Sequence, residues 1–121
     1  MNRRHDEKGA AMVEFAIILP VLLVLLVGII EFGRAYNTQV SIQAAAREGA
    51  RELALRQPDV DARTRAAAPS VDIDSISLSP CPASGDGQAS VTISENFTFG
   101  IPFVPLGTKT LTATGVMRCG L

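Results

Sequence analysis

The sequence predicts an α+β fold, in which a long N-terminal transmembrane helix extends into a small extracytoplasmic domain with a roughly three-stranded antiparallel sheet. Three observations predict it. Residues 10–30 form an apolar run that contains one charged side chain, Glu14. Residues 31–56 contain no proline and place apolar residues at helical spacing. Beyond residue 70 the chain is rich in Ser, Thr, Val and Ile, with Gly and Pro between the runs, which is typical of short strands.

Length and charge limit the possibilities further. A chain of 121 residues has room for one small domain rather than two. Its net charge is −1, and its basic residues are scattered rather than clustered, so the sequence indicates no nucleic-acid partner.

The apolar run is long enough to cross a bilayer. As a helix, residues 10–30 would span about 31 Å, close to the thickness of a hydrocarbon core. Arg3, Arg4 and Lys8 precede the run and Arg34 follows it. Because acidic residues count little in the positive-inside rule, this distribution favours a cytoplasmic N-terminus. We therefore assign 1–9 to a cytoplasmic leader without regular structure, 10–33 to the transmembrane helix and 34–121 to the extracytoplasmic domain.

The helix is expected to continue into water, with a total length of roughly 45 residues. One apolar face of this amphipathic part is predicted from residues that recur at spacings of three, four or six: Phe32, Tyr36, Val40, Ala46, Ala50 and Leu53. Pro20 lacks a backbone donor and should kink or loosen the helix locally. Glu31 marks the far membrane boundary and is expected to be simply interfacial.

The remaining elements follow in order. A short helix is predicted over 59–68, with Asp59 as its cap and Pro69 ending it. Strands are predicted over 71–78, 89–99 and 110–119, and the inward faces of the last two combine apolar residues with a cysteine: Val91, Ile93, Phe97, Phe99, Leu111, Ala113, Met117 and Cys119. The apolar loop 100–107 could pack over the sheet edge or contact a partner.

Two cysteines, Cys81 and Cys119, fall in the extracytoplasmic part, where a disulfide is permitted. A bridge would close a loop of about 38 residues and contribute roughly 4 kcal/mol in the chain-entropy model. Two free thiols are the alternative.

No constellation of side chains indicates catalysis. The one histidine, His5, lies in the leader, so no Ser-His or Cys-His arrangement can be built in the mature chain. The spaced acidic pairs, Asp59 with Asp61 and Asp72 with Asp74, are interpreted as solvated carboxylates rather than a calcium site. The sequence therefore predicts no enzyme, metal, cofactor or small-molecule substrate.

Glu14 is the least expected residue of the apolar run. An ionised side chain at the centre of a membrane helix costs roughly 2.5–3.5 kcal/mol on insertion scales, and insertion itself does not require one. The carboxylate thus indicates a role in which it later meets a positive partner.

Several motifs together make the chain resemble the TadE/TadF-like pseudopilins of tight-adherence (Flp) pili, which are related to type IV pilins. The strongest is Gly9 followed by Ala10-Ala11-Met12-Val13-Glu14-Phe15. Leu19-Pro20 and the segments 30–35 and 45–51 continue the resemblance, with a weaker echo at 111–113 and 117–118.

The resemblance implies how the N-terminus is processed and used. A prepilin peptidase would cut between Gly9 and Ala10, which leaves the apolar helix in the mature protein. Ala10 would then carry an ammonium, and Glu14, with Phe15 beside it in the same subunit-assembly motif, would pair with the ammonium of a neighbouring subunit.

The function implied is that of a minor pilin or pseudopilin. Its partners would be membrane lipid, the prepilin peptidase, other pilin subunits and the assembly machinery of a tight-adherence pilus or related secretion apparatus. It would be a single-pass protein of the bacterial inner membrane that can enter a surface pilus. Two alternatives stay open, an uncleaved bitopic anchor for a binding domain and a secreted domain with an ordinary signal peptide.

Overall fold

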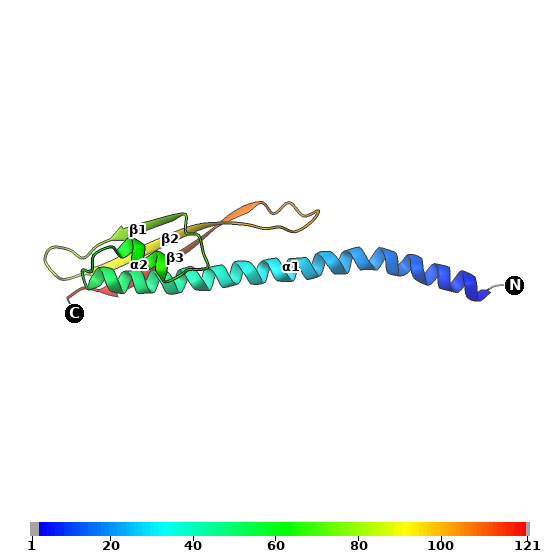
Figure 1. Cartoon of the computed structure of the whole chain (residues 1–121), viewed down its shortest axis with the longest axis horizontal. Helices are drawn as coiled ribbons and strands as arrows, with labels where there is room; N and C mark the ends of the chain where they lie inside the picture. Colours follow the sequence, from blue (N-terminus) through cyan, green and yellow to red (C-terminus); the bar gives the residue numbers. More distant parts are fainter. Residues whose placement is uncertain (1–2, 121) are drawn as a thin grey trace.

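The structure is a computed structural model that describes residues 3–120. Two helices, α1 (Arg3–Ala54) and α2 (Val60–Ala66), precede three strands, β1 (Ser75–Ser79), β2 (Gln88–Thr98) and β3 (Thr108–Arg118). The sheet lies along the C-terminal half of α1, while the N-terminal half extends away from it (Figure 1). This arrangement confirms the predicted α+β fold with a long apolar N-terminal helix.

Helix α1 is longer than the sequence suggests, with 52 residues. It begins at Arg3, so the expectation of an irregular leader is wrong for residues 3–9; residues 1 and 2 lie outside the described part. Asp6 lies in the first turn, where a negative charge interacts favourably with the helix dipole. Gly9 costs the helix only about 1 kcal/mol relative to alanine. Extending an existing helix over such residues is easier than starting a new one.

Pro20 lies inside α1, and the helix continues through it. The N-terminal half of α1 curves gently in Figure 1. The local loosening expected at Pro20 stays a prediction.

The sheet is antiparallel with the order β1-β2-β3, so β2 is its central strand. Val91 of β2 pairs with Leu78 on one side and Gly115 on the other. Val91 and Ile93 are fully buried and Phe97 nearly so, as the alternation predicts. On β3 the residues that face α1 are Leu111, Ala113, Gly115 and Met117, each buried or half-buried.

Strand β1 starts four residues later than predicted. Just before it, a side chain rather than the backbone makes the hydrogen bond to β2. The Asp74 carboxylate accepts the backbone N–H of Asn96 at 2.6 Å. Regular pairing with β2 then begins at Ser75, opposite Ser94.

The contact between α1 and the sheet consists mainly of small side chains. Ala45, Ala46 and Ala50 are fully buried together with Ile42. Of the predicted apolar face, Ala46 and Ala50 are therefore confirmed as buried, whereas the side chains of Phe32, Tyr36 and Val40 are largely exposed. A Cβ built on Gly115 would clash with the Ala46 carbonyl oxygen and with the backbone nitrogen of Arg47. The sheet thus lies so close to α1 that only small residues fit between them.

Helix α2 packs across the end of α1. Thr64 is fully buried against Gly49, and its hydroxyl donates to the Val60 carbonyl at 2.7 Å. Asp59 precedes the helix as predicted, but its backbone is left-handed (φ 56°) and its side chain makes no capping hydrogen bond. The helix also ends at Ala66 rather than Ala68.

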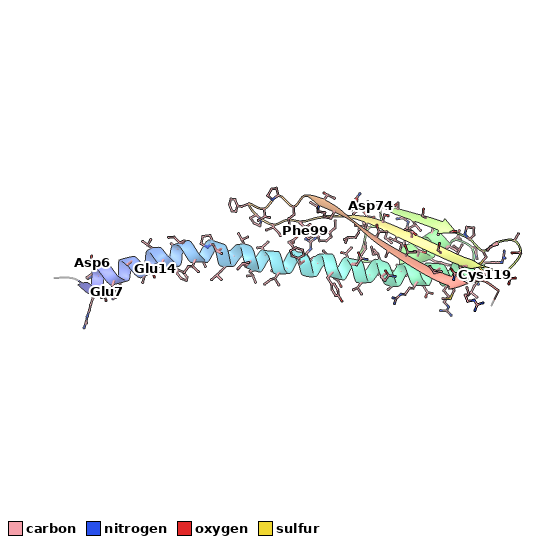
Figure 2. The ribbon with its side chains drawn as sticks, turned by 180° about the vertical axis from the view of Figure 1, so that it is seen from behind. Asp6, Glu7, Glu14, Asp74, Phe99 and Cys119 are labelled. Carbon is pink, nitrogen blue, oxygen red and sulfur yellow. A yellow bond between two sulfur atoms is a disulfide. The ribbon has the colours of Figure 1, made fainter. Side chains whose placement is uncertain are left out.

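Cys81 and Cys119 form a disulfide with a Cα–Cα distance of 5.9 Å. It joins the segment after β1 to the end of β3, where the Cys119 N–H also donates to the Gly87 carbonyl at 3.0 Å. The alternative of two free thiols does not apply to this structure. The bridge fastens the end of the sheet that lies farthest from the N-terminus of α1 (Figure 2).

Candidate functional site

The N-terminal half of α1 presents most of its side chains to the outside, and within residues 4–30 only Val24, Val27 and Gly28 are half-buried. Met12 is 73% exposed and Phe15 61% exposed, and the leucines and isoleucines that follow are exposed as well. Among the described residues, α1 is the one helix long and apolar enough to cross a membrane, and none of its most apolar stretch is buried by the rest of the chain. Such a surface is suited to lipid or to the apolar helices of other subunits.

Glu14 lies on this apolar surface, and its side chain is exposed (Figure 2). Within residues 3–120 no hydrogen bond or ion pair joins it to another side chain. Ala10 precedes it by one helical turn, a rise of about 6 Å. Gly9 is in open surroundings, because a Cβ built there would meet nothing within 4 Å. The three residues expected at the processing and pairing sites are thus accessible on one short stretch of helix.

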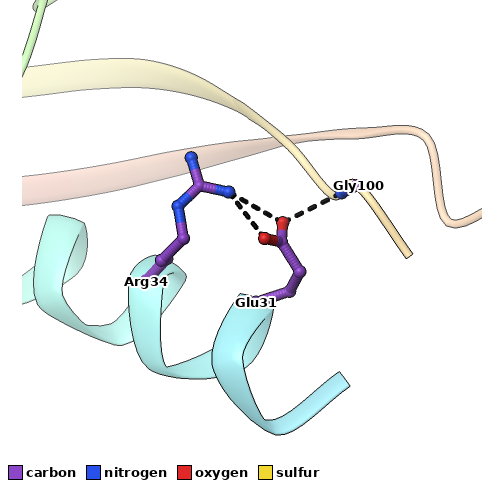
Figure 3. A network of polar contacts seen from close by, with 3 residues as sticks. All are labelled: Glu31, Arg34 and Gly100. Atoms are coloured by element: carbon purple, nitrogen blue, oxygen red, sulfur yellow. Dashed lines mark hydrogen bonds and ion pairs between the residues drawn. The ribbon is translucent and has the colours of Figure 1, made fainter. Parts of the chain in front are cut away.

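The structure adds a polar cluster at Glu31 that the sequence analysis missed. The Glu31 carboxylate accepts two hydrogen bonds from the Arg34 guanidinium, at 2.7 and 2.9 Å, and one from the Gly100 N–H at 2.9 Å (Figure 3). Glu31 is only 7% exposed, so its expected role as a simple interfacial residue is wrong. The available sequence signal was the spacing of Glu31 and Arg34, which places an acid and a base on one helix face.

Aromatic rings reinforce this junction between α1 and the start of the β2–β3 loop. The centroid of the Phe99 ring lies 5.5 Å from that of Phe32 and 5.0 Å from that of Phe97. The Arg34 guanidinium carbon lies 5.3 Å from the centroid of the Phe97 ring, within range of a cation–π interaction. Together these contacts hold the loop against α1 where the apolar run ends.

Three carboxylates gather elsewhere, where β2 passes the segment before β1. Burial raises the pKa of Glu95, and the negative charges of Asp74 and Asp72 raise it further. One of its carboxylate oxygens is buried without a hydrogen-bond partner among the described residues. No group of three His, Cys, Asp or Glu residues within 3–120 is arranged to hold a metal ion.

Replacing Glu95 by glutamine should stabilise the domain at neutral pH. A group whose pKa is raised on folding stabilises the fold below its unfolded pKa, near the ordinary glutamate value, and this stability is lost as pH rises through the folded pKa. Urea unfolding at pH 4 and pH 7 measures the effect. The free energy of unfolding of Glu95→Gln should exceed that of the wild type at pH 7 but not at pH 4. The exposed Asp86→Asn is the control, and an equal response of both variants would refute the assignment.

Comparisons with known proteins concern helix α1, which carries Gly9, Glu14 and Glu31. No curated protein and no solved structure matches the chain. A family model described as TadE-like protein matches residues 9–51, a segment that begins at Gly9 and contains Glu14, Glu31 and Arg34. The match supports a structural role as a minor pilin-like component associated with tight-adherence pili, and with the apolar helix it fits a membrane-anchored component. Over residues 9–51 the chain is therefore TadE-like, as the sequence resemblance predicts.

Proposed function

We propose that the chain is a minor pilin or pseudopilin that a prepilin peptidase clips between Gly9 and Ala10. Its helix α1 then joins a bundle of subunits in a tight-adherence pilus or related secretion apparatus. The observation that carries this proposal is the TadE-like match over residues 9–51, which covers both Gly9 and Glu14.

Clipping requires the start of α1 to unwind, because a protease cleft holds its substrate as an extended chain. Residues 4–9 are exposed, so unwinding them breaks helical hydrogen bonds and little tertiary packing. Gly9 assists because glycine favours the helix least among residues other than proline. Its lack of a side chain also allows a close approach of the cleft.

After clipping, Ala10 carries a new ammonium one turn before Glu14. A charged group that lies alone in lipid is costly, and a second charge of opposite sign reduces the cost for both. If neighbouring α1 helices are offset by about one turn, roughly 6 Å, the ammonium of one lies beside the carboxylate of the next. The pair thereby specifies the register of the bundle.

The rest of the chain fits a single-pass protein of a bacterial inner membrane, with a cytoplasmic N-terminus and an extracytoplasmic domain. The basic residues before the apolar run favour this orientation. The disulfide between Cys81 and Cys119 suits an oxidising compartment on the far side. The other partners of the mature protein would be membrane lipid, pilin subunits and the assembly machinery.

Replacing Gly9 by leucine should abolish clipping in a host that carries the peptidase. The N-terminus of the membrane-extracted protein is read from its intact mass. We expect the wild type to begin at Ala10 and the Gly9→Leu variant to keep the residues before Gly9. Gly33→Leu is the matched control, since a side chain at either position meets open space, and it should be clipped normally. A wild-type protein that keeps its leader would instead indicate an uncleaved anchor, and one that begins beyond Gly33 would indicate secretion.

A further inference from the structure

The loop between β2 and β3 extends beyond the sheet, toward the N-terminal half of α1 (Figure 1). Residues 99–107 contain no charged side chain. Phe103 is 99% exposed, and its φ of 64° lies in a region that residues other than glycine seldom adopt. The loop therefore ends in an aromatic ring that makes almost no contact with the rest of the chain.

A groove of about 570 Å³ lies between this loop and α1. Its lining consists of apolar residues and one glycine, from both sides: Val24, Leu25, Gly28, Ile29, Phe32, Ile101, Val104 and Leu106. Four of the five helix residues belong to the charge-poor run 10–30, which forms the membrane-spanning segment. The groove is thus continuous with the part of α1 that faces lipid.

The hydrogen bond from Gly100 to Glu31 determines how deep the loop lies along α1. Leu25 precedes Glu31 by six residues, a distance of about 9 Å along the helix axis. Apolar segments that bind at membrane interfaces are buried about 5–10 Å into the boundary between headgroups and acyl chains. We infer that residues 100–107 are inserted into the extracytoplasmic leaflet, with acyl chains in the groove and Phe103 among them.

The distribution of charge favours lipid as the occupant. Arg34 lies one turn beyond Glu31, with its side chain 59% exposed, and the exposed Lys109 follows the loop at the start of β3. Basic side chains beside an apolar segment that lies in a membrane interface are attracted to the phosphates of anionic lipids. The uncharged loop is thus followed, away from the apolar run, by the exposed Lys109 and by Arg34, whose guanidinium also binds Glu31, and this order of apolar and basic residues matches the layers of a bilayer leaflet. The inference depends on the membrane placement of α1 and is independent of clipping and of pilus assembly.

Tryptophan fluorescence can test this insertion, because the chain contains no tryptophan. The full chain is reconstituted at high lipid-to-protein ratio into phosphatidylcholine–phosphatidylglycerol vesicles with or without brominated acyl chains. Phe103→Trp reports on the loop, Leu25→Trp on the spanning helix and Val116→Trp on an exposed position of β3. We expect Phe103→Trp to emit at short wavelength and to be quenched by brominated lipid, as Leu25→Trp is, while Val116→Trp is unaffected.

Three results would overturn the inference, and each identifies a different error. If Phe103→Trp behaves like Val116→Trp, the loop lies in water. If it emits at short wavelength without quenching, a protein surface such as a second copy covers it. If Leu25→Trp also escapes quenching, α1 itself is outside the bilayer, and the membrane anchor of the proposed function fails with the loop.

Discussion

Replacing Gly115 by alanine is expected to separate the sheet from helix α1 and to unfold the domain at much lower urea concentration. The added Cβ would clash with the carbonyl oxygen and carbon of Ala46, and these atoms belong to the hydrogen-bonded backbone of α1. Overpacking a core costs about 1–3 kcal/mol even where side chains can move. Because backbone atoms cannot turn away, we expect a loss of about 3 kcal/mol or more, a large part of the stability of a small domain.

Pulse proteolysis in urea measures this loss on the full chain in detergent. Trypsin cuts after Lys109 only once β3 leaves the sheet, so cleavage at this bond, identified by fragment mass, reports on the domain rather than on the apolar half of α1. Gly33→Ala is the matched control, since its new Cβ meets nothing within 4 Å. Equal midpoints for Gly115→Ala and Gly33→Ala would show that the close approach of sheet and helix is wrong.

Replacing Glu14 by glutamine should prevent assembly without preventing membrane insertion. A neutral amide enters lipid more easily than a carboxylate, so the variant should reach the membrane at least as well as the wild type. In the bundle, however, the ammonium of a neighbouring Ala10 would lose its partner. Breaking a buried ion pair costs about 3–5 kcal/mol, which at the lower limit is already more than a hundredfold in association.

The amount of protein recovered in sheared pili or in complexes with other pilins measures this effect. Glu7→Gln is the control, because Glu7 is an exposed acid on the same helix, in the segment that the proposed clipping would remove (Figure 2). We expect recovery to be lost for Glu14→Gln and unchanged for Glu7→Gln. Wild-type recovery of Glu14→Gln would exclude an assembly role for the carboxylate.

The long helix and the sheet could be predicted from the sequence because each depends on a local pattern. The buried face of α1 was predicted only in part, because the size of a side chain as well as its hydrophobicity decides whether it fits beside the sheet. Ala46 lies against Gly115 and is fully buried with Ala45 and Ala50, whereas Tyr36 and Val40 are exposed and Phe32 packs on Phe99 at the start of the β2–β3 loop. Helical spacing alone does not show where two backbones approach so closely that only small residues fit between them.

In the candidate site, too, residues of a continuous motif could be found from the sequence, whereas contacts between distant residues could not. Gly9, Ala10 and Glu14 belong to one continuous motif that lies within the TadE-like match, and their roles in processing and assembly stay predictions. Glu31 was misinterpreted because its third hydrogen bond comes from Gly100, which is 69 residues away in the chain. The start of β1 was misplaced for a related reason, since the Asp74 carboxylate binds the backbone of Asn96. Contacts between side chain and distant backbone leave no periodic signal in a sequence.

Zero-length cross-linking tests the pairing of Glu14 most directly. A membrane-permeant carbodiimide, applied to native membranes or sheared pili, joins a carboxylate to an amine only where the two are in contact. We predict a peptide in which the Glu14 side chain is bonded to the N-terminal amine of an adjoining subunit, absent in Glu14→Gln. A Glu14 that is recovered only unlinked, in material that contains assembled subunits with free N-terminal amines, would contradict the account.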